Sequence, residues 1–185
     1  MSRFKFELEG FLSPDECKNL IERSENIGFQ EYLIQVRGVG QVMNKDVRDN
    51  ERAFFDDKDL ASSLFEKVKQ YLPQEIESRG FNWEPLELNE RFRFYKYQDG
   101  QQFKQHLDGS FVRNENEISK VTMLMYLNDD FEGGATRFVL ENEMVAPKTG
   151  KLLLFRHNIL HSGMPCSNGI KYVLRTDVIY KKKEQ

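Results

Sequence analysis

The C-terminal half of the chain is a series of short β-type segments separated by turn signals, and this pattern limits the fold more than any other feature. Arg91 to Phe94 alternates charged and apolar residues, and 121–128 is a mainly apolar run. Gly133-Gly134 and residues 147–150 supply turns, the second directly before the segment 151–155 (Lys-Leu-Leu-Leu-Phe). Many short strands joined by such turns are typical of sandwiches and jelly rolls, including cupin-like barrels. We therefore expect a mainly β fold of the α+β class.

The N-terminal half carries two helix signals. Residues 13–16, Ser-Pro-Asp-Glu, combine a capping hydroxyl, a proline at the first helical position and a glutamate that can return the hydrogen bond, so a helix should run from about 14 to 26. A second helix is predicted by an apolar stripe at three- and four-residue spacing, which consists of Leu60, Leu64, Phe65, Val68, Tyr71 and Leu72. Residues 31–42 have β character, and Gly38 and Gly40 mark a hairpin or loop there.

The length of 185 residues suits a single domain. We expect residues 1–87 to form a helical support with leading strands, and residues 88–181 to form the β core. The two helices should then pack on a sheet of that core.

Charge and composition narrow the class of partner. Lys and Arg number 27 against 30 Asp and Glu, a net charge of -3, so no global positive field attracts nucleic acid, although a local basic patch stays open. No apolar run reaches the roughly 18 residues of a membrane span, and the start of the chain lacks an apolar signal core, so we expect a cytoplasmic protein. Cys17 and Cys166 are too few for a disulfide framework.

The main chemical signal is His106-Leu107-Asp108, followed 53 residues after the aspartate by His161. In an extended strand, side chains two residues apart lie on one face, so His106 and Asp108 can bind one ion. Two histidines and a carboxylate fill three adjacent corners of an octahedron and leave the others open, as in non-haem Fe(II) sites that activate oxygen. Taken alone, the His-Leu-Asp triplet is a weak signal for a metal site. Lys171, ten residues after His161, adds a cation that could pair with a carboxylate of a ligand across the metal.

Several motifs in order resemble the Fe(II)- and 2-oxoglutarate-dependent dioxygenases, and within them the prolyl 4-hydroxylase-like branch. The motifs are residues 97–108 (YQDGQQFKQHLD), 121–128 (VTMLMYLN), 133–138 (GGATRF) and 161–172 (HSGMPCSNGIKY). The resemblance covers residues 88–181 and implies a double-stranded β-helix. It also implies Fe(II), 2-oxoglutarate as co-substrate, molecular oxygen, and ascorbate as a reductant.

The resemblance assigns roles to individual residues. His106, Asp108 and His161 match the metal ligands, and Lys171 matches the basic residue that holds the distal carboxylate of 2-oxoglutarate. His157 competes for the place of the second histidine, but it lacks a proline four residues later and a cation ten residues later, both of which follow His161. We expect His157 to be a loop or supporting histidine.

Further residues have candidate roles around the co-substrate. Tyr126 matches a tyrosine that donates a hydrogen bond to the co-substrate carboxylate, and Tyr97 matches one upstream of the first metal histidine. Arg175 shares a strand face with Lys171, and it has three candidate partners: the other end of the keto acid, a substrate carboxylate, or Asp177 in a surface pair. Weaker candidates are Thr136 and Asn128 near the site and Arg48, Asn50 and Arg52 for substrate selection.

The resemblance implies oxidative decarboxylation of 2-oxoglutarate to succinate, coupled to hydroxylation of a substrate. Asp108 favours hydroxylation, because halogenating relatives have a small residue at that position. A peptidyl proline or another protein side chain is the first expected substrate, and a small molecule stays open. Two alternatives are a nucleic-acid demethylase of the same superfamily and a non-catalytic cupin-like binding module.

Overall fold

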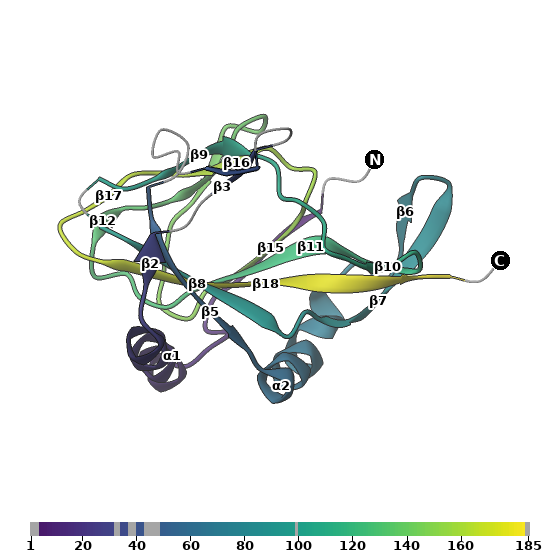
Figure 1. Cartoon of the computed structure of the whole chain (residues 1–185), viewed down its shortest axis with the longest axis horizontal. Coiled ribbons are helices and arrows are strands. Elements are labelled where there is room, and N and C mark those ends of the chain that lie inside the picture. The colour runs from purple at the N-terminus through teal and green to yellow at the C-terminus, as the bar shows by residue number, and fades with distance from the viewer. Residues whose placement is uncertain (1–3, 32–33, 37–39, 43–48, 99, 184–185) are drawn as a thin grey trace.

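The computed structural model describes residues 4–31, 34–36, 40–42, 49–98 and 100–183. A large curled sheet runs through the centre of the molecule (Figure 1). Its strands lie in the order β1 (Lys5–Leu8), β15 (Leu152–Arg156), β11 (Glu117–Tyr126), β18 (Lys171–Lys182), β8 (Arg91–Tyr97), β5 (Glu51–Asp56) and β2 (Gln30–Glu31). Three more strands extend it: β7 (Phe81–Leu88) pairs with β18, β6 (Ile76–Ser78) with β7, and β10 (Val112–Asn114) with β11.

A smaller sheet covers one face of the large sheet. Its strands lie in the order β14 (Glu143–Val145), β13 (Thr136–Phe138), β16 (His161–Gly163) and β9 (Phe103–His106). Two further strand pairs are β12 (Glu132–Gly133) with β17 (Cys166–Ser167) and β3 (Ile34–Val36) with β4 (Gly40–Val42). Apolar side chains of both sheets meet in one core, among them Tyr126 and Val173 from the large sheet and Phe138 from the small one. The predicted mainly β, jelly-roll fold is confirmed.

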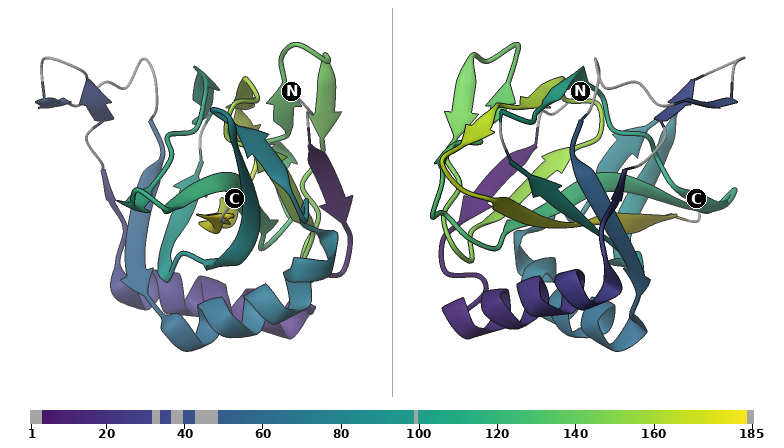
Figure 2. Two further views of the ribbon diagram at one scale, coloured as in Figure 1. Left: turned by 90° about the vertical axis from the view of Figure 1, so that its right-hand side faces the viewer. Right: turned by 60° about the vertical axis from the view of Figure 1, so that its left-hand side comes forward.

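Two helices lie against the opposite face of the large sheet (Figures 1 and 2). They are α1 (Pro14–Ile27) and α2 (Lys58–Val68), the second followed by the 3₁₀ turn η1 (Lys69–Tyr71). Both predicted helices are confirmed, and so is the capping box, in which Ser13 and Glu16 exchange side-chain to backbone hydrogen bonds. Within the described ranges, no helix has the length and apolar character needed to cross a membrane.

Alternation along each central strand separates the two faces of the large sheet. On β11, Leu124 and Tyr126 contact the core between the sheets, whereas Met123 and Met125 belong to the core beneath the helices. Because β18 lies between β11 and β8, its side chains at positions 171, 173 and 175 face the same interior as Tyr126. This interior holds the candidate site.

The leading strands are built into the sheet of the core. β1 pairs with β15, and β5 pairs with β8. The predicted hairpin in residues 31–42 is present as the antiparallel pair β3 and β4, although Gly38 lies outside the described residues.

Candidate active site

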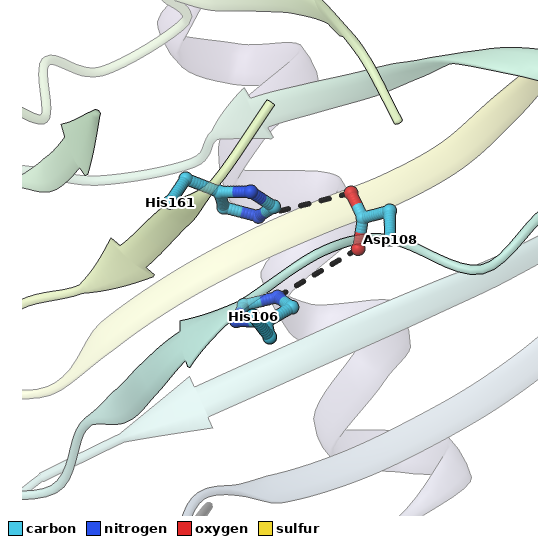
Figure 3. A group of neighbouring side chains, drawn as sticks. All are labelled: His106, Asp108 and His161. Atoms are coloured by element: carbon cyan, nitrogen blue, oxygen red, sulfur yellow. Dashed lines mark ion pairs between the residues drawn. The ribbon is translucent and has the colours of Figure 1, made fainter. Parts of the chain in front are cut away.

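Three metal-binding side chains meet at the open end between the two sheets. His106, Asp108 and His161 each offer a ligand atom, and these atoms all lie within 4.8 Å of one another. Figure 3 shows the imidazoles of β9 and β16 turned toward the carboxylate. Nε2 of His106 lies 3.7 Å from Oδ1 of Asp108, and Nε2 of His161 lies 3.7 Å from Oδ2. The strand pairing of His106 with His161 places these residues side by side.

The position of Asp108 corrects one sequence expectation. β9 ends at His106, so Asp108 lies in the loop after the strand and not within it. Its backbone N–H donates to the carbonyl of His157 at 3.2 Å, which takes this part of the chain away from β16 and toward the large sheet. The carboxylate therefore reaches the two histidines from the loop.

Backbone carbonyls determine which ring nitrogens face the centre. Nδ1 of His106 lies 2.8 Å from the carbonyl of Lys104, and Nδ1 of His161 lies 2.9 Å from the carbonyl of Ile159. A carbonyl only accepts, so each Nδ1 donates a proton and each Nε2 keeps its lone pair for an ion. Burial lowers the pKa of His161, which favours the neutral, ligating form.

Asp108 is held as a carboxylate. Burial alone would raise its pKa, but the charge of Arg175, the histidines and the hydrogen bond from Thr122 outweigh burial and keep the pKa below the ordinary value. Nη1 of Arg175 lies 3.0 Å from Oδ1, and the Thr122 hydroxyl donates to Oδ2 at 2.6 Å. Two neutral imidazoles and a carboxylate are the donor set that suits Fe(II), so the residues present fit that ion.

Lys171 lies deeper between the sheets, without an acidic partner among the described residues. Its Nζ donates to the carbonyl of Gly134 and lies 4.9 Å from the ring centre of Tyr97 and 5.6 Å from that of Tyr126. Burial lowers the pKa of Lys171 to about 8. A buried cation surrounded by tyrosines and carbonyls suits the carboxylate of a bound ligand.

Tyr126 and Thr136 lie beside this cation. The two hydroxyls are 2.6 Å apart, and Tyr126 is fully buried. Burial raises the pKa of Tyr126, so its hydroxyl stays protonated and can donate a hydrogen bond. The structure thus brings Tyr97, Tyr126, Thr136 and Lys171 together.

A groove of about 430 Å³ opens beside the triad. Phe103, Leu107 and Phe111 contribute apolar lining, and Phe103 stacks on His106 with 3.5 Å between ring centres. Three arginines also line the groove: Arg52, Arg93 and Arg175. Arg93 donates to Asp177 at 2.9 Å, and Arg175 contacts both Asp108 and Asp177, so two of the three cations are paired with buried carboxylates.

Residues 92–176 match the family model of the 2OG-Fe(II) oxygenase superfamily. This protein is therefore similar to that superfamily over slightly less than half of its chain. The matched segment runs from β8 to β18 and includes His106, Asp108, His161 and Lys171. The fold thus brings together the residues that the sequence motifs singled out.

Individual relatives of this protein are prolyl hydroxylases by name. It is 23% identical over 188 residues to a protein of Acanthamoeba polyphaga mimivirus that is provisionally named prolyl 4-hydroxylase, with 91% of this chain and 71% of that protein covered. The viral collagen prolyl hydroxylase of Paramecium bursaria Chlorella virus-1, solved with 2-oxoglutarate, has a TM-score of 0.66 at 19% identity and covers 96% of each chain. A prolyl hydroxylase of Trichoplax adhaerens, solved with a peptide fragment of the hypoxia inducible factor oxygen degradation domain, has a TM-score of 0.68 at 16% identity, covering 94% of this chain and 82% of that one.

The other residues singled out from the sequence lie around the site in different ways. His157 is not part of the triad, because its Nε2 faces Asp177 at 3.5 Å. Asn128 ties the strand ends together, since it donates to the carbonyl of Ile170 and accepts from the backbone of Tyr172. Asn50 is buried and donates to the carbonyl of Glu51, while Arg48 lies outside the described residues.

One alternative for Arg175 was wrong. Its contact with Asp177 is not a surface pair, because Asp177 is only 1% exposed. Sequence reasoning also missed Arg93, Thr122 and the role of Asp177 in this part of the protein. A usable signal was present, since an acidic residue at 177 directly precedes the apolar run 178–180 within β18.

Proposed function

We propose that this protein is an oxygenase of the 2-oxoglutarate- and Fe(II)-dependent superfamily and a hydroxylase, which couples the oxidative decarboxylation of 2-oxoglutarate to the hydroxylation of a prolyl residue in a peptide. The observation that carries the proposal is the pairing of the triad with a buried lysine that lacks an acidic partner among the described residues. A divalent ion held by the triad alone would need no such cation. A dicarboxylate that reaches from the ion to Lys171 would use both.

His106, Asp108 and His161 would hold Fe(II) through two Nε2 atoms and one carboxylate. When bound, Fe(II) supplies oxygen activation and the oxidation of the keto acid. The chain supplies the geometry: the carbonyls of Lys104 and Ile159 orient the two imidazoles, and the side chains of His161 and Asp108 are 7% and 3% exposed, which keeps bulk water away from them.

We assign Lys171 as the anchor of the distal 2-oxoglutarate carboxylate, assisted by the hydroxyl of Tyr126 and the neighbouring Tyr97 and Thr136. Arg175 is the competing anchor, but its guanidinium already contacts two carboxylates, those of Asp108 and Asp177. A third carboxylate would gain less there than at Lys171, which has none among the described residues.

The groove beside the triad would hold the peptide. Leu107 and Phe111 expose apolar side chains at its edge, with 57% and 40% of their surface accessible, which suits the contacts of an extended peptide. The relatives named prolyl 4-hydroxylase and the peptide-bound Trichoplax structure favour a prolyl substrate. The paired state of Arg93 and Arg175 speaks against a basic groove for nucleic acid.

Two further points belong to the proposal. We take ascorbate as the reductant that the protein would use with Fe(II), as the family resemblance implies. We also take the location to be cytoplasmic. Cys17 and Cys166 form no disulfide among the described residues, which is compatible with a reducing compartment.

The test is succinate formation from 2-oxoglutarate in air with Fe(II), ascorbate and a panel of proline-containing peptides, with mass spectrometry for a peptide that gains one oxygen atom. We expect succinate and the oxygen gain with the wild-type protein and neither with His106→Ala. Succinate that forms without any hydroxylated prolyl peptide would keep the oxygenase and reject the substrate. Absence of succinate and of 2-oxoglutarate binding would favour the non-catalytic binding module.

A further inference from the structure

Arg175 connects the metal triad to a second buried acid. Nη1 lies 3.0 Å from Oδ1 of Asp108, and Nη2 lies 3.1 Å from Oδ1 of Asp177. The side chain of Arg175 is 12% exposed, and those of the two aspartates are 3% and 2% exposed. Burial by itself would lower the pKa of Arg175, but the two carboxylates raise it well above the ordinary value. The guanidinium is therefore a fixed cation between two fixed anions.

Together, two donors hold both oxygens of Asp108. Arg175 donates to Oδ1, and the Thr122 hydroxyl donates to Oδ2 at 2.6 Å. Asp108 belongs to a loop and lacks the strand pairing that holds His106 and His161. Its rotamer is thus set mainly by these two side-chain contacts, which leave the remaining lone pairs turned toward the imidazoles.

Arg175 is in turn held from the other side. Asp177 accepts from Arg175 through Oδ1 and from Nη1 of Arg93 at 2.9 Å through Oδ2. Arg93 and Arg175 are opposite each other on the paired strands β8 and β18. The chain of contacts from Arg93 through Asp177 and Arg175 to Asp108 joins the triad to the paired strands β8 and β18 of the large sheet.

We propose that Arg175 is a positioning residue that fixes the carboxylate of Asp108 for metal binding, with Asp177 and Arg93 as its support. The inference rests on the proposed function, because it takes the triad as the metal site. It assigns Arg175 a task other than the three considered from the sequence, since neither the keto acid nor the substrate is its main partner.

A purely electrostatic role and a positioning role of Arg175 predict opposite changes in the affinity for a divalent cation when Arg175 is replaced by glutamine. Loss of a positive charge 3.0 Å from a ligand oxygen would by itself strengthen the binding of a divalent cation. Loss of the orienting donor would weaken it, by about 10- to 100-fold as for other supporting residues of metal sites. A weaker affinity of Arg175→Gln for the cation would therefore show that Arg175 orients the Asp108 carboxylate, since loss of its charge alone would strengthen binding.

The experiment measures the affinity of the metal-free protein for Mn(II) by titration calorimetry, without 2-oxoglutarate, and the visible absorption spectrum of the Co(II) form. The variants are Arg175→Gln and the double variant Arg175→Gln/Asp177→Asn, which restores the charge balance of the buried cluster. We expect both variants to bind Mn(II) about 10- to 100-fold more weakly and to show an altered Co(II) spectrum. The double variant should be the more stable of the two in thermal unfolding, because only Asp108 has then lost its contact with Arg175, whereas in Arg175→Gln both buried carboxylates have lost it.

A matched control is the exposed pair Arg91 and Asp56 on the same sheet, where Arg91→Gln/Asp56→Asn should leave both readouts unchanged. The proposal is overturned if the double variant regains wild-type Mn(II) affinity and spectrum, since Arg175 would then only neutralise Asp177. It is also overturned if Arg175→Gln binds Mn(II) as tightly as the wild type. Failure of the wild-type protein to bind Mn(II) or Co(II) would instead count against the proposed function.

Discussion

Lys171 and Arg175 lie four residues apart on the same face of β18, yet their surroundings differ in kind. Lys171 contacts two tyrosine rings and a carbonyl, and no carboxylate among the described residues. Arg175 contacts two buried carboxylates. Burial lowers the pKa of the lysine to about 8, whereas the carboxylates raise the pKa of the arginine. The comparison teaches that a buried cation without an acid is available for a ligand, and one already paired is part of the scaffold.

The largest expected effect comes from removing a member of the metal triad. Asp108→Ala removes a ligand and also leaves Arg175 and Thr122 without their shared acceptor. Mn(II) affinity should fall by more than about 100-fold, beyond the loss caused by a supporting residue, and succinate formation should stop. Calorimetry with the metal-free protein checks this. Unchanged Mn(II) affinity would place the metal site elsewhere.

The second largest effect distinguishes the role of Lys171 from that of Arg175. Lys171→Ala should weaken 2-oxoglutarate binding by about 10- to 150-fold, since a charge-assisted hydrogen bond is worth roughly 1.5–3 kcal/mol, while Mn(II) affinity stays near wild type. Calorimetric titration of 2-oxoglutarate into the Mn(II) protein measures this loss. The matched control is Lys151→Ala, because Lys151 is also buried but lies 3.7 Å from Glu7.

A reversed order would refute the comparison. If Arg175→Gln weakened 2-oxoglutarate binding more than Lys171→Ala at saturating Mn(II), the arginine would be the anchor and the lysine part of the scaffold. The two variants therefore belong in the same titration series.

The pKa of Lys171 predicts that the affinity for 2-oxoglutarate depends on pH, with a smaller effect near neutrality than that of the Lys171→Ala substitution. Lys171 is charged below its pKa of about 8 and loses its proton above it. Affinity for 2-oxoglutarate should be flat below pH 8 and fall by up to about tenfold per pH unit above it. Lys171→Arg should remove this dependence, because a guanidinium stays charged over the whole range. A flat profile in the wild type to about pH 10 would contradict the role of Lys171.

The smallest expected effect concerns the neighbouring hydroxyl. Tyr126→Phe removes one donor and should weaken 2-oxoglutarate binding by about 2- to 10-fold, the equivalent of a neutral hydrogen bond. The same variant leaves Thr136 without its 2.6 Å partner. Thr136→Val tests that second consequence. Equal losses of affinity in the two variants would show that Tyr126 acts only through Thr136.

Local sequence signals predicted the elements whose causes are local. The capping box at Ser13 and Glu16 and the stripe from Leu60 to Leu72 placed both helices, because each depends on residues within one or two turns. The strand on which Lys171 and Arg175 were expected to share a face is present as part of β18. The motif order predicted which residues the site would gather, and the fold does bring His106, Asp108 and His161 together.

Non-local pairing explains what the sequence could not predict. The end of β9 at His106 depends on its register with β16, more than 50 residues away. The contact of Arg93 with Asp177 spans 84 positions and exists because β8 and β18 are neighbours in the sheet. No periodicity in either segment reports such a pair, so the support of Asp108 became visible only in the structure.

The most direct test of the central claim is a crystal structure of the protein grown without oxygen in the presence of Fe(II) and 2-oxoglutarate. We predict that one iron is bound by His106, Asp108 and His161, that the distal carboxylate contacts Lys171, and that Arg175 keeps its contacts with Asp108 and Asp177. An iron bound by other residues, or a distal carboxylate on Arg175 with Lys171 unengaged, would contradict the account.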